Sequence, residues 1–312
     1  MKEIGRVPVV FLHCGRQNYL KTAIYVAQKN NDILLIGDNS NRDYCANWFC
    51  IDDYQNIKFE NFKNNYKHMS SNSESFELMC FQRYFYLYEF MKKERLQTAI
   101  MVDSDVLVYG NLHQYFKQYN CGCAFSIPYK QEPYIWVAGP QCCYWTLNSL
   151  HSFIEYLGSF YDTYIDMLEE KYKYGKSKNK KGGICDMTAL YLWGKERKDV
   201  LNLAIIKNNI VFDCSLQSSA NYFPNEFCFD KILRIKKLYY VNDRLYFKTV
   251  RGELVEAVIV HCQGSSKAIM SMIYKKSNRI FLIVIRYLEF AKRIIKRVHK
   301  KLCLEEKNII CQ

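Results

Sequence analysis

The segment AIMVDSDVLV, residues 99–108, decides the fold that we expect for this chain. Residues 99–102 are apolar and rich in strand-forming side chains, which predicts a buried strand of a parallel sheet. Asp103 and Asp105 follow at once, so their carboxylates are expected at the C-terminal end of that strand, where open α/β sheets bind ligands. Two hard oxygen donors at this place suit Mg²⁺ or Mn²⁺. A surface loop without a metal is the alternative.

The N-terminal residues supply neighbours for this strand. Residues 7–13 and 32–37 are apolar and predict two strands, and residues 18–30 between them have helical spacing. This order predicts a parallel, right-handed βαβ unit. We therefore expect an α/β fold with a mostly parallel, Rossmann-like central sheet and flanking helices.

Patterns in the rest of the chain predict further elements. Ser71 and Glu74 form a plausible capping box for a long helix that runs to about Glu94. The other predicted elements are a loop over 61–75, a helix over 147–164, a flexible stretch over 171–183, a short helix over 186–192 and a hairpin within 229–260 that turns at Asn242-Asp243. Because no linker separates two cores, we expect one domain over residues 1–272 and a tail over residues 273–312.

The composition indicates a folded protein with reduced cysteines. Hydrophobic residues make up 49% of the chain, which excludes a disordered class. The 14 cysteines have neither the spacing of a disulfide framework nor that of a zinc site. Residues 1–5 lead directly into a predicted strand and do not resemble a signal peptide. We expect a cytoplasmic protein whose cysteines pack as small apolar side chains.

One arginine is predicted to meet the two carboxylates. Arg83 falls on the expected apolar face of the long helix, in step with Phe76 and Met79. A guanidinium on a buried face needs an anionic partner. Asp103, Asp105 or a bound phosphate is the expected partner, and an arginine that extends to solvent at the rim of the core is the alternative.

A second motif, HCQGSSK at residues 261–267, follows a predicted strand near the C-terminus. His261 ends the strand, Gly264 permits a tight turn, and Lys267 can reach a phosphate as a point charge. Together with the two carboxylates, these residues predict a site for a divalent cation that holds a diphosphate. A structural histidine at the end of a strand is the alternative.

With both motifs in view, the chain resembles the nucleotide-sugar glycosyltransferases of the GT-A fold, and their family 8 in particular. That family has D-x-D after a buried strand and H-x-x-G-x-x-K near the C-terminus, which occur here at 103–105 and 261–267. Arg83, on the helix before the strand, also fits the pattern. The resemblance implies transfer of a hexose from a nucleotide-diphosphate sugar, UDP-linked, to a saccharide or lipid-linked saccharide. It further implies a retaining reaction in bacterial surface glycan synthesis, such as that of lipopolysaccharide.

The resemblance also implies roles for individual residues. Asp103, Asp105 and His261 would bind Mn²⁺ or Mg²⁺. The residues that would contact the donor are Phe11, His13, Tyr19, Arg83, Asp103, Ser104, Gly264 and Lys267. Asp186, which opens the short helix, would orient the acceptor or act as general base. A plain helix N-cap is the alternative for Asp186.

Several positions depart from the pattern of the family. The first strand ends in HCG at 13–15, where an acidic residue is common, although Tyr19 offers an aromatic face to the base. Asp186 stands alone where the family has D-Q-D, and Met187 takes the place of the glutamine of retaining members. Lys267 is followed by Ala-Ile and not by Pro-Trp. These departures bear on the stereochemistry more than on sugar transfer.

The net charge of +13 is concentrated near the C-terminus. Between Lys275 and Lys301 lie ten Lys or Arg residues and one acidic residue, Glu289. Apolar residues from Ile280 to Leu302 recur within a sector of about 120°, which predicts a basic amphipathic helix. We expect residues 275–302 to lie peripherally on the anionic inner face of the cytoplasmic membrane. A helix packed on the domain is the alternative, and nucleic acid is not expected as a partner because no recognition module accompanies the charge.

Two other functional classes stay open at the level of sequence. A Mg²⁺-dependent phosphohydrolase would use Asp103 as nucleophile, but Val106-Leu107 follows where such enzymes commonly have threonine, and residues 261–267 would have no role. A non-catalytic adaptor at a membrane surface would keep the fold without turnover.

Overall fold

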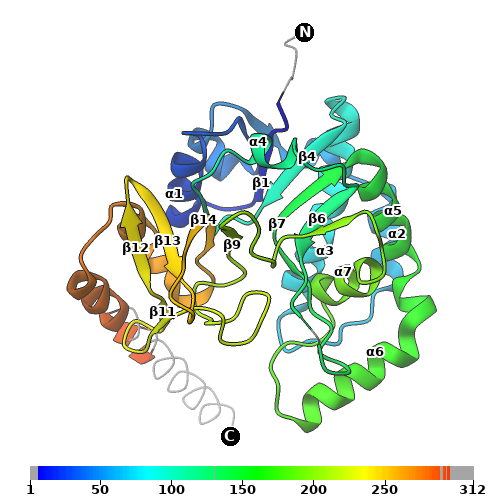
Figure 1. Ribbon diagram of the computed structural model, residues 1–312. Coiled ribbons are helices and arrows are strands. Elements are labelled where there is room, and N and C mark those ends of the chain that lie inside the picture. Colours follow the sequence, from blue (N-terminus) through cyan, green and yellow to red (C-terminus); the bar gives the residue numbers. More distant parts are fainter. Residues whose placement is uncertain (1–5, 130, 289–290, 293, 296–312) are drawn as a thin grey trace, which may run out of the picture.

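The computed structural model describes residues 6–129, 131–288, 291–292 and 294–295, and it has a mixed α/β architecture (Figure 1). The strands of the central sheet are β1 (Val9–His13), β2 (Ile33–Gly37), β3 (Trp48–Cys50), β4 (Thr98–Val102), β6 (Cys123–Ser126), β7 (Gly139–Thr146) and β8 (Val200–Asn202). Their order is β3-β2-β1-β4-β7-β6-β8. All neighbours pair in parallel except β7, which is antiparallel to β4 and β6. The predicted α/β fold with a mostly parallel central sheet is therefore confirmed.

A second sheet lies beside the first and contains strands from the C-terminal part of the chain. Its strands are β5 (Val106–Val108), β9 (Ile210–Phe212), β12 (Leu238–Val241), β13 (Arg244–Lys248) and β14 (Leu254–His261). A short ribbon of β10 (Phe229–Asp230) and β11 (Ile235–Lys236) accompanies them. Although β5 follows β4 almost directly along the chain, it pairs with β14 and not with the central sheet.

Helices cover both faces of the central sheet (Figure 1). They are α1 (Asn18–Ala27), α2 (Ile57–Asn65), α3 (Glu74–Lys93), α4 (Leu112–Phe116), α5 (Leu147–Gly158), α6 (Phe160–Ser177), α7 (Asp186–Gly194) and α8 (Met270–Tyr274), with the 3₁₀ helices η1 (Asn39–Tyr44), η2 (Ile51–Tyr54) and η3 (Gly264–Ile269). One apolar core includes α1 and the second sheet, and the other includes α2, α3, α5 and α7.

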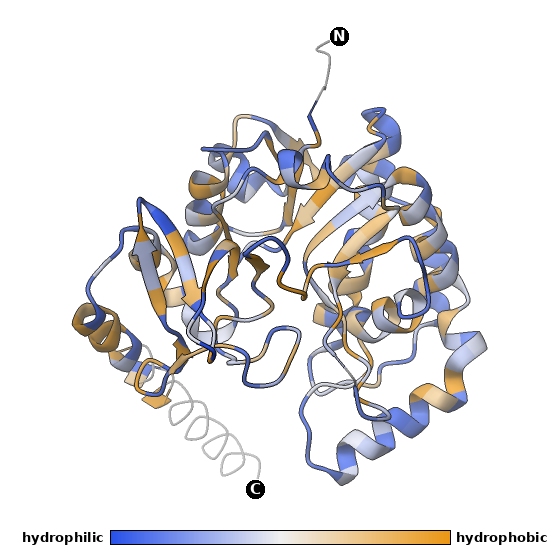
Figure 2. Ribbon diagram, viewed as in Figure 1, coloured by the Kyte–Doolittle hydropathy of each residue, from blue (hydrophilic) through white to orange (hydrophobic). Residues whose placement is uncertain are grey.

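Alternate residues of the central strands enter these two cores. In β1, Val9 and Phe11 join the first core and Val10 joins the second. In β4, Val102 joins the first core and Met101 the second. Because successive side chains of a strand point to opposite faces, a strand buried on both sides must be apolar throughout. Figure 2 shows this apolar character along β1 and β4.

The start of α3 differs from the prediction. The capping residue is Ser73, whose Oγ accepts a hydrogen bond from the Phe76 N–H (3.4 Å). The predicted cap at Ser71 is wrong, because Ser71 Oγ instead accepts a hydrogen bond from the Gly182 N–H (2.8 Å). The predicted apolar face is also wrong at this end, since Phe76 and Met79 are exposed.

Three predicted boundaries also change. The predicted loop over 61–75 begins later, because residues 61–65 complete α2, whose Phe62 is buried. The predicted helix over 147–164 is divided into α5 and α6, which meet at Ser159. The predicted flexible stretch over 171–183 is wrong for its first part, because α6 continues to Ser177 through the buried Lys171.

The predicted hairpin with a turn at Asn242-Asp243 is confirmed. These two residues join β12 to β13 with φ values of 46° and 65°. Positive φ at both positions is the geometry that a two-residue hairpin turn requires, and asparagine and aspartate tolerate it.

The chain remains helical beyond the predicted domain boundary at residue 272. Residues 279–288 form a helix, and the described residues 291–292 and 294–295 are also helical. Ile273 and Leu282 are buried in the first core, so this part of the predicted tail packs on the domain. Within the described ranges, no helix is both long and apolar enough to span a bilayer. The prediction of an amphipathic helix runs to residue 302, and its last part, residues 296–302, lies outside the described ranges.

Candidate active site

The site forms where the chain passes from one sheet to the other. Asp103 and Asp105 flank the turn between β4 and β5, which is closed by a hydrogen bond from the Val106 N–H to the Asp103 carbonyl (3.1 Å). The β5–β14 ladder places His261 opposite Val106. The Cys262 N–H then donates to the Asp105 carbonyl (2.8 Å). Two segments that lie far apart in the sequence are thus joined beside the carboxylates.

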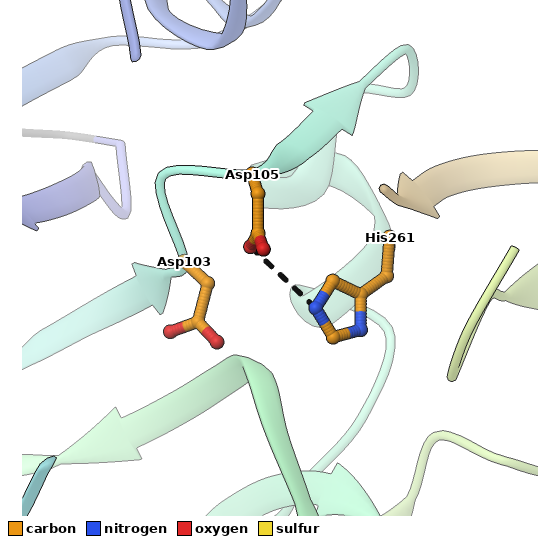
Figure 3. Close-up of side chains that lie close together, drawn as sticks. All are labelled: Asp103, Asp105 and His261. Carbon is orange, nitrogen blue, oxygen red and sulfur yellow. Dashed lines mark ion pairs between the residues drawn. The ribbon is translucent and has the colours of Figure 1, made fainter. Parts of the chain in front are cut away.

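The three predicted metal ligands converge in this turn. Oxygen atoms of Asp103 and Asp105 and a ring nitrogen of His261 lie within 4.8 Å of one another (Figure 3). His261 Nε2 is 3.5 Å from Asp105 Oδ1. The other ring nitrogen, Nδ1, lies 2.8 Å from the Cys214 carbonyl, to which it can donate only when protonated. That bond leaves Nε2, on the side of the carboxylates, as the nitrogen that could ligate a metal, which is the usual arrangement for a metal-binding histidine.

Lys267 completes the cluster from η3. Its Nζ is 3.0 Å from Asp105 Oδ2 and lies over the ring of Tyr19, 4.8 Å from the ring centroid. Gly264, at the start of η3, has φ of 60°, which turns the chain so that Lys267 reaches back. The structure therefore brings together the D-x-D turn and the C-terminal motif, as predicted.

The positive charge around Asp105 determines its protonation. Burial opposes ionisation of the Asp105 carboxyl, but hydrogen bonds and charge from His261 and Lys267 outweigh it and hold its pKa well below the usual range. Burial likewise opposes protonation of His261, while its contact with Asp105 raises the pKa of the ring above the ordinary value. The Asp105 carboxyl is therefore ionised at neutral pH.

Arg83 lies between two carboxylates, those of Asp103 and Asp186. Its Nη1 is 2.5 Å from Asp103 Oδ1, and its Nη2 pairs with Asp186 Oδ2. The Tyr84 hydroxyl also donates to Asp186 Oδ2 (3.2 Å). The predicted pairing of Arg83 with Asp103 is thus present. Asp186 does not cap α7 with its side chain, because its carboxylate is turned toward Arg83 and is only 3% exposed.

Of the other residues predicted to contact the donor, some lie near the site and one is buried in the core. His13 and Tyr19 face each other at the C-terminal end of β1, with ring centroids 5.9 Å apart. Ser104 is half-buried in the turn between the two carboxylates. Phe11 is a correction. Its side chain is fully buried in the first core and does not reach the C-terminal edge of the central sheet.

Several residues that support the site were not predicted. Asp213 accepts from the His261 N–H (3.0 Å) and pairs with Lys236 (2.5 Å), and both side chains of this pair are fully buried. Gln217 donates to the Gln263 carbonyl (2.7 Å) and so holds the loop before η3. Asp213 follows the strand β9, so it carried the same signal as the D-x-D motif, a carboxylate at the end of an apolar run.

Comparisons with known proteins find likeness among solved structures alone. No family model matches the chain, and no curated protein matches it. The chain is similar to mouse xyloside xylosyltransferase 1 in its apo form, with 11% identity, a TM-score of 0.44, and coverage of 63% of this chain and 84% of the other. It is also similar to the galactosyltransferase LgtC in complex with donor and acceptor sugar analogues, with 15% identity, a TM-score of 0.36, and coverage of 66% and 75%. Both TM-scores are below 0.5, so this likeness does not identify a function.

Proposed function

We propose that this chain is a metal-dependent GT-A glycosyltransferase that moves a hexose from a nucleotide-diphosphate sugar, UDP-linked, to a saccharide or lipid-linked saccharide in surface glycan synthesis. The observation that carries the proposal is the convergence of Asp103, Asp105 and His261 within 4.8 Å, with Lys267 against Asp105. Two carboxylates, an imidazole and an ammonium suit a divalent cation that holds a diphosphate. The sequence resemblance to glycosyltransferase family 8 supports the same activity.

The residues of the site fit Mn²⁺ or Mg²⁺. Asp103, Asp105 and His261 would hold the ion, and Nδ1 of His261 is already engaged by the Cys214 carbonyl. When bound, the ion would supply positive charge that stabilises the departing diphosphate. Lys267 would add a second positive charge, and Gly264 would let the backbone of η3 approach the phosphates.

The donor and the acceptor would approach from different sides of this cluster. His13 and Tyr19 would face the nucleotide, and Ser104 would meet the donor in the turn. Asp186 would orient the acceptor hydroxyl through Oδ1, because Oδ2 is engaged by Arg83 and Tyr84. We propose retention at the anomeric carbon, although Met187 stands where retaining members of family 8 have glutamine. The anomeric coupling constant of the product, measured by NMR, tests this part.

The activity can be tested before any acceptor is known. Calorimetry should detect UDP binding that requires Mn²⁺, and a screen of UDP-sugars should reveal slow Mn²⁺-dependent hydrolysis. Absence of UDP binding with and without Mn²⁺ would overturn the proposal and favour a non-catalytic adaptor. Covalent trapping of a phosphoaspartate at Asp103 would overturn it in favour of a phosphohydrolase.

The contribution of Lys267 to diphosphate binding gives a separate prediction. Lys267→Met should weaken UDP binding about tenfold, because a hydrogen bond to a charged group contributes about 1.5–3 kcal/mol and this side chain is 36% exposed, which favours the lower end. Binding of uridine, which has no phosphate, should not change. Calorimetry of both ligands measures the difference, with Lys21→Met on the exposed side of α1 as control. An equal loss for UDP and uridine would contradict a role at the diphosphate.

We also propose that the C-terminal helix binds an anionic membrane surface. Its described part packs on the domain through Leu282, and Arg279 pairs with Asp230 (2.5 Å). Six residues of the predicted apolar sector are exposed in the described part of this helix and so face away from the domain: Ile280, Val284, Tyr287, Leu288, Ile294 and Ile295. This arrangement favours the membrane-binding alternative over a helix packed on the domain through its apolar face.

Vesicle binding tests the membrane proposal. The full chain should bind phosphatidylcholine vesicles that contain phosphatidylglycerol, and salt should weaken the binding. The triple variant Tyr287→Ser, Leu288→Ser, Ile294→Ser should bind at least about tenfold less, because burial of each apolar side chain contributes about 1.5–3 kcal/mol. The control replaces the exposed Ile57 and Ile205 with serine. Unchanged binding of the triple variant in a flotation assay would contradict the proposal.

A further inference from the structure

A cavity lies between α6 and the start of α7, and it is lined by Cys185 and Met187, the two neighbours of Asp186 in the sequence. Its volume is about 340 Å³, and it is enclosed by α6, the start of α7, the loop at 182–183 and the loop at 134–137. The backbone is closely packed at Gly183, where a Cβ would lie 2.1 Å from the Met69 carbonyl oxygen. Met187 and Thr188, on the first turn of α7, also line the cavity.

The cavity contains a buried lysine that has no carboxylate partner in the described part of the chain. Lys171 is only 8% exposed, and its Nζ donates to the carbonyl groups of Tyr134 (2.8 Å) and Ile135 (2.6 Å). Burial lowers the pKa of Lys171 to about 8. A buried ammonium without a counter-ion is costly, so an anionic group beside it would be bound favourably.

A buried hydroxyl in the same cavity also lacks a partner. Thr188 is 1% exposed, and its Oγ1 forms no hydrogen bond with the residues that the structure describes. Buried polar atoms are nearly always hydrogen-bonded, and the exceptions often mark a position that a ligand completes. This observation is independent of the charge on Lys171 and points to the same cavity.

The charged side chains that line the cavity are all positive among the described residues. Lys176, Lys180 and Lys181 line it together with Lys171, and no aspartate or glutamate is among its described lining residues. The three additional lysines are exposed and would attract an anion to the opening. The cavity thus combines an electropositive opening with a buried ammonium and an unpaired hydroxyl.

We propose that this cavity binds an anionic group, a phosphate or a carboxylate, on the acceptor saccharide. The inference rests on the proposed function. Met187, which lines the cavity, directly follows Asp186, and Arg83 joins Asp186 to Asp103 of the cluster that would hold the donor. An acceptor whose hydroxyl meets Asp186 would place a neighbouring substituent beside Lys171. The chain would then select acidic acceptors over neutral ones of the same size.

Direct binding of small sugars tests the inference without any assay of activity. Calorimetry on the full chain, with Mn²⁺ and UDP present, compares glucose 6-phosphate, glucuronic acid and methyl glucoside. We expect at least one of the two acidic sugars to bind at least tenfold more tightly than the neutral one, and the tighter of the two identifies phosphate or carboxylate as the preferred group. Equal affinity for all three sugars would overturn the inference. A failure of UDP to bind would instead count against the proposed function, since the sugar titrations remain measurable without it.

Two variants assign the binding to this cavity. Lys171→Met should remove the preference for acidic sugars, whereas Lys173→Met, which alters an exposed lysine on the same helix outside the cavity, should retain it. Thr188→Val should weaken acidic-sugar binding severalfold with no loss of thermal stability, because it replaces an unpaired hydroxyl by a methyl group of similar size. An acidic-sugar preference that survives in Thr188→Val and in folded Lys171→Met would overturn the assignment.

Discussion

Replacing Asp105 with alanine is expected to abolish Mn²⁺-dependent UDP binding and UDP-sugar hydrolysis while the chain stays folded. Asp105 faces both His261 and Lys267, and it is one of the three candidate ligands. Even residues that only orient metal ligands account for about 10–100-fold in metal affinity, so loss of a ligand should cost at least about 100-fold.

The control for Asp105→Ala is Asp53→Ala, which removes an exposed carboxylate from η2. Circular dichroism and thermal unfolding establish that each variant is folded, and calorimetry with UDP at several Mn²⁺ concentrations measures the effect. The metal hypothesis could not survive an Asp105→Ala variant with the activity of the unaltered chain.

Arg83→Met is expected to destabilise the protein by about 3–5 kcal/mol, the largest stability effect that we predict. The guanidinium is 14% exposed and pairs with both Asp103 and Asp186. Its removal leaves two carboxylates close together with no positive charge between them, and the buried Tyr84 hydroxyl cannot neutralise them. Urea unfolding, followed by fluorescence, measures the change in the free energy of unfolding.

A matched control for Arg83→Met exists at the surface. Arg16 pairs with Asp43 at 2.6 Å, and both side chains are more than half exposed. Exposed ion pairs contribute only about 0–1 kcal/mol, so Arg16→Met should change stability little. If the two variants lost similar amounts of stability, the buried pair would not have the structural role assigned to it.

The parts of the site that could be predicted are those placed by regular strands. Asp103 and His261 each stand at the end of an apolar strand, Asp103 after β4 of the central sheet and His261 in β14 of the second sheet, and the β5–β14 pairing brings the two strand ends together. Arg83 was predicted because a charge within a mostly apolar helix requires a partner. Phe11 was wrong because it lies two residues before the end of β1, where its side chain is in the core, whereas His13 on the same face ends the strand and is only partly buried.

The parts that could not be predicted depend on tertiary contacts of irregular segments. Gln217 lies in a loop, and nothing in its sequence context indicates that it holds the loop before η3. Phe76 and Met79 looked like core residues, but α3 is apolar on several sides, so its pattern does not define one buried face. The end of α6 looked like a loop because of its glycines and lysines, although lysine is a good helix former.

The passage of the chain from β4 to β5 has a consequence for stability. Asp103 ends a strand of the central sheet, whereas His261 belongs to β14 of the second sheet. An ion shared by these residues would act as a cross-link between the two sheets. By thermodynamic linkage, each increase in free Mn²⁺ above its dissociation constant would then raise the melting temperature of the whole fold. Slower hydrogen exchange at the Cys262 amide, which donates across the junction, would report the same coupling locally.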